Sequence, residues 1–587
     1  MIATILPFDD SRRLTGPSSF LAQPGAALET APGIVIDEAI IAAWRERIST
    51  ARRWLGWPGE ATFARPHASG ASFAFAAPAD QLFCATEVNE WALCWALGDR
   101  SQYSPGHAAT WDEDSARATL AAQAREEALP ALAALLDAAA MHEMPALVGE
   151  DLLTLGSGHG SQSFPFDALP APAEIPWNEL HAIPVALVTG SNGKTTTVRL
   201  IAAMLRAAHR RTGFSCTDGL FVEGEPIEAG DYSGPVGART VLRRPDIDAA
   251  VLETARGGLL RRGLALQRAD VAVVTNVSAD HFGEYGVHSV ADLVNVKLAV
   301  ARALDAAGTL VLNADDEGLR RAAALFPESR RFKLAWFAPD HDSVHLIAAR
   351  ERKEATCGLR ANRLLLSPPD GTPFDLGCAD AMPISLNGRA RYNLANAAAA
   401  ALAAAALGIP PATIADVLSR FGRHNADNRG RLEHWRINGV DVWLDYAHNP
   451  DGLRGLLDAV AAQRRGRLGL ILGHAGNRLD ADIRELATTA ARFSPDRVLL
   501  KDIAGYERGR QSGEVAAVLR AALLEHGIPD TAISFVAEES DAVRTLLDWA
   551  QPGDVLVLPI HGVEARKEVV ALLDGLDKSA AGRDGTT

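Results

Sequence analysis

The sequence predicts an α/β protein with an N-terminal α+β domain, a central P-loop domain and a C-terminal Rossmann-like α/β domain. In the central part, short apolar runs alternate with stretches of helical periodicity, which indicates a mostly parallel sheet covered by helices on both faces. The length of 587 residues suits about three to four domains at roughly 150 residues each. The expected parts are 1–155, a linker at 156–180, 181–427, 428–577 and a disordered tail at 578–587.

The N-terminal part mixes strand-like and helical stretches and carries no recognisable chemistry. Glu87–Leu97 has helical spacing, with Trp91 and Trp95 on its apolar face, and we interpret these tryptophans as core residues. A second helical stretch, Asp114–Met141, is rich in alanine and leucine. Residues 156–180 are rich in glycine, serine and proline, which predicts a linker.

Beyond the linker, the chain repeats a strand-then-helix pattern. The segment 397–407 is almost pure alanine, which predicts a tightly packed helix that ends at Gly408. A third αβ block begins near Arg431, after the polar, turn-rich stretch 423–430. The strand candidates of these two blocks are Val185–Thr189, Ala249–Leu252, Val271–Thr275, Thr309–Leu312, Val442–Leu444, Leu468–Leu472, Val498–Leu500 and Val555–Leu558.

Composition and charge argue against several classes of partner. The net charge is -15 and no long basic block offsets it, so nucleic acid or an anionic membrane is not expected as the main partner. No apolar run approaches the ~18 residues of a membrane span, and the first residues do not resemble a signal peptide. The 5 scattered cysteines suit free thiols in a reducing compartment, so we expect a cytoplasmic protein.

The strongest chemical signal is a glycine-containing loop between a predicted strand and a predicted helix. Its glycines let backbone N–H groups face phosphate oxygens, and the following helix presents its positive end to them. Lys194 is expected to reach the β- and γ-phosphates of ATP, and the Thr195 hydroxyl to bind Mg²⁺. The strict phosphate-loop spacing would place a glycine at Val188, so a chance glycine turn is the alternative. The loop comprises Gly190, Ser191, Asn192, Gly193, Lys194, Thr195 and Thr196.

This loop and four later segments resemble the Mur ligase family of ATP-dependent amide-bond-forming enzymes. The resemblance covers roughly residues 181–575. The later segments are Asn276–His281, similar to the N-x-[ST]-x-D-H motif; Lys297, near the position of a frequently carbamylated lysine; Asn393 with Asn396, similar to the segment that contacts adenine; and Gly430–Arg431 with Asp445–Pro450, similar to motifs of the C-terminal domain.

The resemblance implies a set of roles around ATP and one or two Mg²⁺ ions. Thr195 and Glu253 are expected to hold the ATP-bound Mg²⁺, because an acid at the end of a strand in such a sheet faces the ligand crevice. His281, with Lys297 carbamylated, would hold a second Mg²⁺. As an isolated observation, Lys297 would be a solvated helix lysine.

Nucleotide and substrate contacts are predicted from the same segments. Asn396, Arg431 and Asp445 are expected to bind the nucleotide, although Asp445 could equally accept a hydrogen bond at the end of its strand. Arg256 and Arg262 are candidates for bidentate binding of a substrate carboxylate, or are surface charge. Asp218 and His448 complete the predicted substrate residues.

Within the family, the likeness is to the ligase module of the cyanophycin synthetase branch. It rests on Thr217–Gly219, Glu253–Gly258, Gly283, Gly388–Asn393 and Arg508–Arg510. That branch carries an ATP-grasp domain where this chain has only the predicted linker, so we expect one ligation and not a full cycle. The segment 559–564 matches the branch poorly, which leaves the amine acceptor open.

Three functional hypotheses follow. The first is a ligase that joins an amino acid such as arginine to an aspartate-like carboxylate of an amino acid or peptide, through an acyl phosphate. The second is a ligase of the folylpolyglutamate type. The third is a nucleotide-binding subunit without chemistry of its own that serves a separate partner ligase; Lys194, Glu253 and His281 together argue against it. The related synthetases are oligomers, which makes a homo-oligomer a further expectation.

Overall fold

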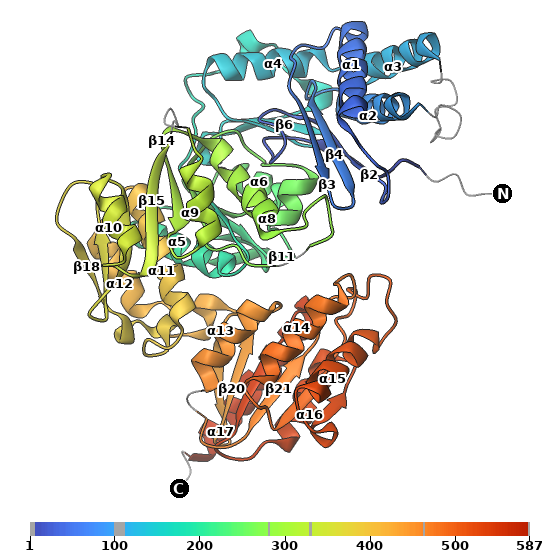
Figure 1. The fold of residues 1–587 in the computed structure, drawn as a ribbon. Helices are drawn as coiled ribbons and strands as arrows, with labels where there is room; N and C mark the ends of the chain where they lie inside the picture. The colour runs from blue at the N-terminus through green and yellow to red at the C-terminus, as the bar shows by residue number, and fades with distance from the viewer. Residues whose placement is uncertain (1–5, 99–111, 280–281, 328–331, 462–463, 585–587) are drawn as a thin grey trace.

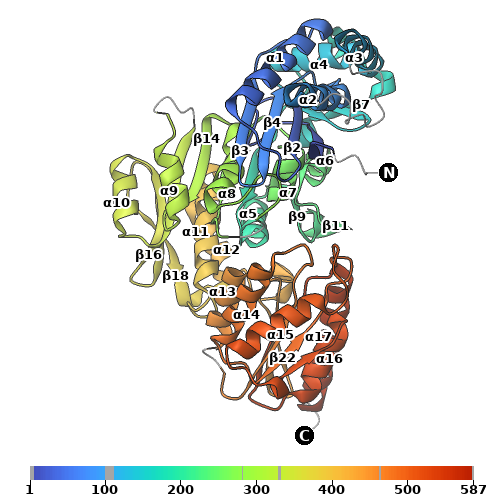
Figure 2. The ribbon, with the colours of Figure 1, turned by 45° about the vertical axis from the view of Figure 1, so that its right-hand side comes forward.

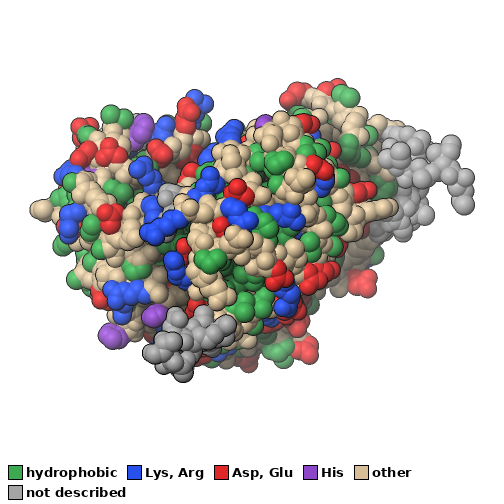
Figure 3. All heavy atoms as spheres, turned by 90° about the horizontal axis from the view of Figure 1, so that it is seen from below, with side chains coloured by type: hydrophobic (Ala, Val, Ile, Leu, Met, Phe, Trp, Pro, Cys, Tyr) green, Lys and Arg blue, Asp and Glu red, His purple; other side chains and the backbone are tan. Residues whose placement is uncertain are grey.

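The computed structural model describes residues 6–98, 112–279, 282–327, 332–461 and 464–584, with side chains to residue 577. The central domain lies between the N-terminal and C-terminal domains (Figures 1 and 2). Basic and acidic side chains are interspersed over the face that Figure 3 shows. No helix of the described part is long and apolar enough to cross a membrane.

The N-terminal domain packs helices on an antiparallel sheet of order β1-β2-β4-β3. Trp91 is buried in the same core as Trp44, Phe73 and Phe75, and Trp95 packs partly buried against that core, which confirms the prediction that both tryptophans are core residues. Pro130 begins a new helix, so the predicted stretch 114–141 forms two helices. The elements are β1 Phe8–Leu14, β2 Gly25–Thr30, α1 Glu38–Leu55, β3 Thr62–His67, β4 Gly70–Ala76, α2 Leu82–Leu97, α3 Glu113–Glu127 and α4 Pro130–Met141.

The segment 156–180 is structured, which differs from the predicted linker. β7 (Gln162–Pro165) joins β5 (Ala146–Val148) and β6 (Leu152–Leu155) in a three-stranded sheet. Backbone hydrogen bonds tie the segment to the central domain, with the His159 N–H donating to the Ile247 carbonyl at 2.9 Å. Its glycine, serine and proline composition signals turns, and those turns here connect ordered strands and short 3₁₀ helices.

The central sheet has eleven strands in the order β11-β10-β9-β12-β8-β13-β14-β15-β16-β17-β18. The strands from β9 to β16 in this order are parallel, as predicted, and antiparallel hairpins extend both edges. The bounds are β8 Val185–Thr189, β9 Thr212–Cys216, β10 Gly219–Val222, β11 Glu225–Ala229, β12 Ala249–Glu253, β13 Ala269–Val274, β14 Leu304–Asn313, β15 Lys333–Asp340, β16 Ala355–Arg360, β17 Arg363–Ser367 and β18 Phe374–Cys378.

Helices cover both faces of this sheet because its strands are apolar on both sides. In β8, Ala186 and Val188 face one core while Val185 and Leu187 face the other. The first core is closed by α5 (Lys194–Ala207), α11 (Arg391–Ala406) and α12 (Pro411–Arg420). The second is closed by α6 Pro235–Leu242, α7 Arg256–Arg261, α8 Val290–Lys297, α9 Glu317–Ala324 and α10 Val344–Glu351.

The C-terminal domain is a six-stranded sheet of order β19-β20-β24-β21-β22-β23, parallel except for β19. The four predicted strands are present. Helix α17 continues into the segment 578–584, where disorder is expected, because extending a formed helix needs no new nucleation. The bounds are β19 Glu433–Ile437, β20 Val440–Asp445, α13 Pro450–Ala461, β21 Leu468–Leu472, α14 Asp480–Ala491, β22 Arg497–Leu500, α15 Glu514–Glu525, β23 Ile533–Phe535, α16 Glu539–Trp549, β24 Val555–Pro559 and α17 Val563–Asp584.

Candidate active site

A cavity of about 1090 Å³ lies between the central and C-terminal domains. The carboxyl ends of β8, β12 and β13 open into it, which is where open parallel sheets bind ligands. Residues from the C-terminal domain form the opposite wall, including the stretch 445–448 after β20. In the part of the chain that the structure describes, no N-terminal residue up to 155 lines this cavity.

The loop 190–196 has the backbone that a phosphate-binding loop requires. Gly190 and Gly193 have positive φ angles of 151° and 83°. A Cβ atom at Gly193 would lie 2.1 Å from Oδ1 of Asn396, and one at Gly190 would lie 1.8 Å from Oγ1 of Thr275. Glycine is therefore required at both positions, and the predicted adenine-contacting Asn396 lies directly against the loop.

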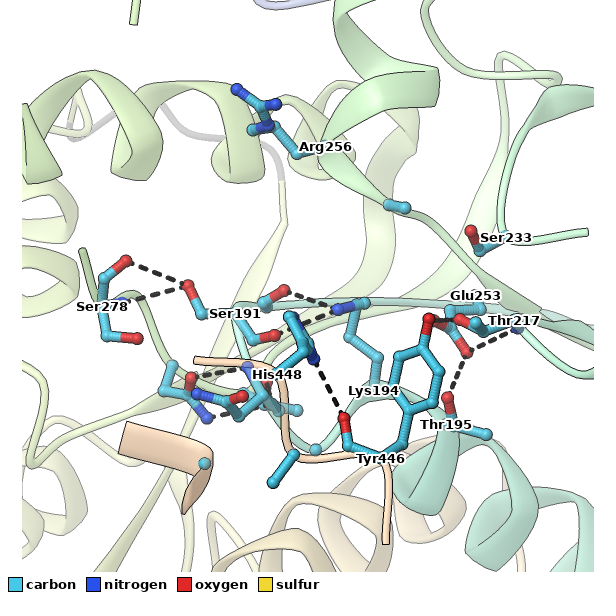
Figure 4. Close-up of a pocket in the computed structure, with 18 of the residues that line it drawn as sticks. Ser191, Lys194, Thr195, Thr217, Ser233, Glu253, Arg256, Ser278, Tyr446 and His448 are labelled. Atoms are coloured by element: carbon cyan, nitrogen blue, oxygen red, sulfur yellow. Dashed lines mark hydrogen bonds between the residues drawn. The ribbon is translucent and has the colours of Figure 1, made fainter. Parts of the chain in front are cut away.

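Lys194 begins helix α5 and curls back over the loop. Its Nζ donates to the carbonyl oxygens of Gly190 and Ser191 at 3.2 and 3.1 Å, as Figure 4 shows. This places the ammonium group over the loop and at the edge of the cavity. Its position fits a contact with phosphate oxygens that enter the loop.

The segment that begins at Asn276 braces the same loop. Oδ1 of Asn276 accepts from the backbone N–H of Asn192 at 3.0 Å, and its Nδ2 donates to the Asn192 carbonyl at 3.0 Å. Oγ of Ser191 donates to the carbonyl of Ser278 at 3.2 Å. The two remaining residues of the predicted motif, Asp280 and His281, lie outside the described residues.

Glu253, at the end of β12, is 1% exposed and accepts two hydroxyl hydrogen bonds. Oγ1 of Thr195 donates to Oε2 at 2.8 Å, and Oγ1 of Thr217 donates to Oε1 at 2.8 Å (Figure 4). A carboxylate and a hydroxyl beside a phosphate loop form an oxygen donor set that fits Mg²⁺. The sequence predicted Thr195 and Glu253 for this site, and the structure adds Thr217.

Lys297, the last residue of α8, lines the cavity and is 3% exposed. It is therefore not a solvated helix lysine. A buried lysine that lines a ligand cavity is placed to contact what binds there.

Asp218 does not line the cavity, and its carboxylate holds guanidinium groups in place. Arg199 of α5 and Arg566 of α17 each contact it at 2.9 Å, and Arg431 contacts it at 3.6 Å. Burial alone would raise the pKa of Asp218, but these guanidinium groups hold it at about 2. The structure therefore gives this predicted substrate residue a role in joining the two domains.

Arg431 and Asp445 sit at the C-terminal wall of the cavity. Nη2 of Arg431 donates to Oγ1 of Thr195 at 3.3 Å, and its guanidinium lies 4.5 Å from the ring centre of Tyr446. Oδ2 of Asp445 accepts from the backbone N–H of Leu432 at 2.8 Å. Burial raises the pKa of Asp445, and the charge of Arg431 opposes that shift. Arg431 therefore contacts the phosphate loop, and Asp445 lines the same cavity.

The predicted carboxylate-binding arginines form a separate wall. Arg256 and Arg262, at the two ends of α7, both line the cavity. In Figure 4, Arg256 lies apart from the group that Lys194, Thr195 and Glu253 form. Arg256 pairs with Glu284, whose pKa burial would raise but Arg256 lowers. Part of this wall is thus preorganised by an internal carboxylate.

Comparison with known proteins identifies the two domains around this cavity. The Mur ligase middle domain matches residues 188–404, and the Mur ligase, glutamate ligase domain matches residues 430–559. These two matches include the phosphate loop, Glu253, Lys297 and Asp445. The chain belongs to the Mur ligase family.

This Mur ligase chain is similar to curated relatives of two kinds. It is 33% identical to a cyanophycin synthetase of Synechocystis sp. over 394 residues, covering 66% of this chain and 44% of the relative. It is 28% identical to a UDP-N-acetylmuramoyl-L-alanyl-D-glutamate--2,6-diaminopimelate ligase of Xanthomonas campestris pv. campestris over 404 residues, covering 67% and 75%. The chain thus spans less than half the length of the cyanophycin synthetase.

Solved structures with a similar arrangement include MurF from Acinetobacter baumannii and E. coli FolC. MurF is 18% identical with a TM-score of 0.46, covering 67% of this chain and 76% of that one. FolC, solved with DHPP and ADP, is 18% identical with a TM-score of 0.46, covering 67% and 89%.

Two site residues of this Mur ligase were missed by sequence reasoning because their partners lie far away in the chain. Asn449 donates from Nδ2 to Oδ1 of Asn192 at 3.0 Å, which joins the C-terminal domain to the phosphate loop. Glu284 accepts from Nδ2 of Asn477 at 2.9 Å, which makes a second bridge between the domains. Asn449 belongs to the Asp445–Pro450 motif, so this motif could have identified it as a residue of the site. His448 itself lines the cavity, and its Nδ1 lies 3.2 Å from the Tyr446 carbonyl oxygen.

Proposed function

We propose that this Mur ligase chain joins a carboxylate to an amine with ATP, through an acyl phosphate, and releases ADP and phosphate. One observation carries the proposal: the phosphate loop with Lys194 and the Thr195–Glu253 pair opens into the same cavity as the arginine wall of α7. A triphosphate and a carboxylate can therefore be held side by side. The C-terminal domain closes the cavity over both.

The chemistry requires activation because a carboxylate oxygen is a poor leaving group. A substrate carboxylate oxygen attacks the γ-phosphorus of ATP; the bond to the bridging oxygen breaks and ADP leaves with that electron pair. The amine nitrogen then attacks the acyl carbon, phosphate leaves, and the nitrogen gives up a proton as the amide forms. The first step brings two anions together and the second releases the phosphate anion, so cations around the transferred group are the main catalytic requirement.

The residues of the chain meet this requirement in two places. Lys194 holds positive charge over the loop, and Thr195 and Glu253 would hold Mg²⁺, which when bound neutralises phosphate charge. Arg256 and Arg262 would orient the substrate carboxylate by paired N–H donors. We propose Lys297, carbamylated, and His281 as the holders of a second Mg²⁺.

The substrates we propose are an aspartate-like carboxylate of an amino acid or peptide and an incoming amino acid such as arginine. Support comes from the 33% identity to cyanophycin synthetases over the ligase domains. The match covers 44% of that relative. We propose that the chain performs this one ligation alone, as a homo-oligomer or beside a separate partner ligase.

The test is a screen of ATP hydrolysis over pairs of amino acids and short isoaspartyl peptides, with mass analysis of nucleotide and amide products. We expect one carboxylate and one amine together to stimulate release of ADP and phosphate. Release of AMP and pyrophosphate would exclude the acyl phosphate. Nucleotide binding without turnover under every pair would favour a non-catalytic subunit, and turnover with a folate and glutamate would favour the folylpolyglutamate alternative.

Lys194→Ala is expected to reduce substrate-dependent ATP hydrolysis by at least about 100-fold, because the loop loses its phosphate-facing charge. Lys353→Ala is the matched control, since this exposed lysine pairs with Asp370 far from the cavity. Circular dichroism should show the same folded content in both variants. Wild-type turnover by the Lys194 variant would contradict the assignment of the loop.

A further inference from the structure

The N-terminal domain contributes none of its described residues to the cavity, yet it holds two segments that do line it. We infer that this domain acts on the ligase site from outside, by fixing the segment 282–292 and the end of α7, with Arg65 as the principal positioning residue. The inference rests on the proposed function for what these segments bind. It gives the N-terminal domain a role without requiring it to contact a substrate.

Arg65, in β3, makes a two-pronged contact with the first of these segments. Its Nη1 donates to Oδ1 of Asp292 at 2.6 Å, and its Nη2 donates to the carbonyl of Gly286 at 2.8 Å. The hairpin turn that follows β3 adds a third contact, with Oγ of Ser69 2.9 Å from Nε2 of His288. Three bonds from one hairpin therefore fix both ends of the segment 286–292.

Asp292, which Arg65 contacts, also caps the start of α8. Its other oxygen, Oδ2, accepts from the backbone N–H groups of His288 and Ser289, which caps the start of α8. Lys297 is the last residue of the same short helix and lines the cavity. Because α8 is rigid between its cap and Lys297, fixing the cap from outside also fixes the position of Lys297.

A buried ion pair of the same domain holds the second segment. Arg12 of β1 is 5% exposed and pairs with the buried Glu29 at 2.7 Å. Nε of Arg12 donates to the carbonyl of Leu260 in α7 at 2.8 Å, and its guanidinium lies 4.7 Å from the ring centre of Tyr285. One side chain thus contacts both cavity-lining segments.

Backbone contacts continue this attachment past α7. The N–H of Thr15 donates to the Arg262 carbonyl at 2.8 Å, and the N–H of Leu264 donates to the Pro17 carbonyl at 2.7 Å. A Cβ atom at Gly16 would lie 2.1 Å from the Leu264 carbonyl oxygen, so the two backbone segments are in direct contact without intervening side chains. The position of Arg262 in the cavity wall is therefore set directly by the N-terminal domain.

The two segments meet again at the cavity through Glu284, which pairs with Arg256 and accepts from Asn477 of the C-terminal domain. Loosening 282–292 would therefore disturb the carboxylate-binding wall and one bridge to the C-terminal domain. The phosphate loop should be spared, because its contacts come from Asn276, Thr275 and Asn396 and not from this segment. Nucleotide binding and carboxylate binding should thus respond differently.

The experiment compares the full chain with Arg65→Ala, Arg65→Lys, Ser69→Ala and the control Arg125→Ala. Arg125 belongs to the same domain, is exposed on α3 and donates to Ala121 of its own helix. Amide hydrogen exchange followed by mass spectrometry reports on residues 256–264 and 282–297, and calorimetry with ADP reports on the phosphate loop. For the substrate pair found in the screen, KM for the carboxylate and for ATP are measured separately.

We expect Arg65→Ala to raise exchange in 282–292 several-fold and Ser69→Ala to raise it less, with ADP affinity and exchange in α1 and α2 unchanged. KM for the carboxylate should rise several-fold while KM for ATP stays within two-fold (about 0.4 kcal/mol), and Arg65→Lys should recover part of the loss. Unchanged exchange in 282–292, or a rise spread equally over the N-terminal domain, would overturn the inference. Hydrogen exchange and ADP binding are measured without the carboxylate and the amine. They therefore test this inference even if the proposed ligation is wrong.

Discussion

Asp218 shows at the scale of one residue how a buried charge can serve the site without touching it. Its carboxylate joins α5, which follows the phosphate loop, to Arg431 and Arg566 of the C-terminal domain. The sequence motif around it was specific to a branch of the family and suggested substrate binding. Its partners lie up to several hundred positions away, so only the fold could show that they are arginines.

Asp218→Asn should weaken the contact between the two domains, because three guanidinium groups would then lose the carboxylate charge that they share. Breaking a buried ion pair by removing one partner typically costs about 3–5 kcal/mol. We expect a larger radius of gyration by small-angle scattering and a raised KM for ATP. Asp416→Asn, which removes an exposed pair with Arg420 within α12, is the control. Equal radii for the two variants would contradict a joining role.

The same carboxylate predicts a pH dependence. Its pKa in the folded protein is about 2, below the usual value of 3.8, so its stabilising effect is complete above about pH 4. The effect is lost as pH falls through the folded pKa. Near neutral pH the free energy of unfolding of the wild type should therefore not change with the protonation of Asp218. Below about pH 4 it should fall less steeply with pH in Asp218→Asn than in the wild type, as measured by urea unfolding at several pH values.

At the scale of elements, periodicity predicted the parallel strands well because each is a short apolar run that is buried on both faces. The strand Val185–Thr189 and the strand Leu468–Leu472 have the predicted bounds. Periodicity missed the edge hairpins, such as β10 with the fully exposed β11, because an edge strand with one exposed side carries no continuous apolar run. It also missed the order in 156–180, where turn residues connect packed strands.

Helix α11 illustrates a prediction from composition that packing explains. The residues from Ala397 to Ala404 are at most 2% exposed, and their helix packs beside α5 on the strands β13 to β17. Only small side chains let a helix approach its neighbours on every side. Composition indicated such a helix, but its orientation toward the phosphate loop, which brings Asn396 against Gly193, needed the tertiary structure.

Ala400→Leu should destabilise the central domain by about 1–3 kcal/mol, because added methyl groups force a fully buried, close-packed helix away from its neighbours. Ala406→Leu, at the exposed end of the same helix, is the matched control and should change stability little. Urea unfolding followed by tryptophan fluorescence measures both. If Ala400→Leu and Ala406→Leu had the same free energy of unfolding within error, α11 would not be as closely packed at Ala400 as the structure indicates.

At the scale of the whole molecule, the site exists only where the domains meet. The central domain supplies the phosphate loop and the α7 wall, the C-terminal domain supplies Arg431 and the bond from Asn449 to Asn192, and the N-terminal domain holds the wall from outside. The sequence predicted the phosphate loop, the arginines of the α7 wall and Arg431 from motifs. It could not give the third, because contacts such as Arg65 with Asp292 join isolated residues that no motif marks.

Glu433 lies at the junction of the central and C-terminal domains and gives that junction a pH response. It is 3% exposed at the start of β19 and accepts the backbone N–H of Gly430. Burial raises its pKa from 4.5 to about 7. A carboxyl group whose folded pKa is raised stabilises fully below its unfolded pKa, and that contribution is lost as pH rises through the folded value.

Glu433→Gln should therefore become progressively more stable than the wild type between about pH 4.5 and 7, with a gain that levels off at up to about 3 kcal/mol at higher pH. Glutamine keeps an oxygen for the Gly430 N–H while removing the buried charge. Urea unfolding at several pH values measures the difference, with the exposed Glu514→Gln as control. Parallel stability curves for Glu433→Gln and wild type would show that this carboxyl group is not the source of the response, because only a charge that forms within this range can make the curves diverge.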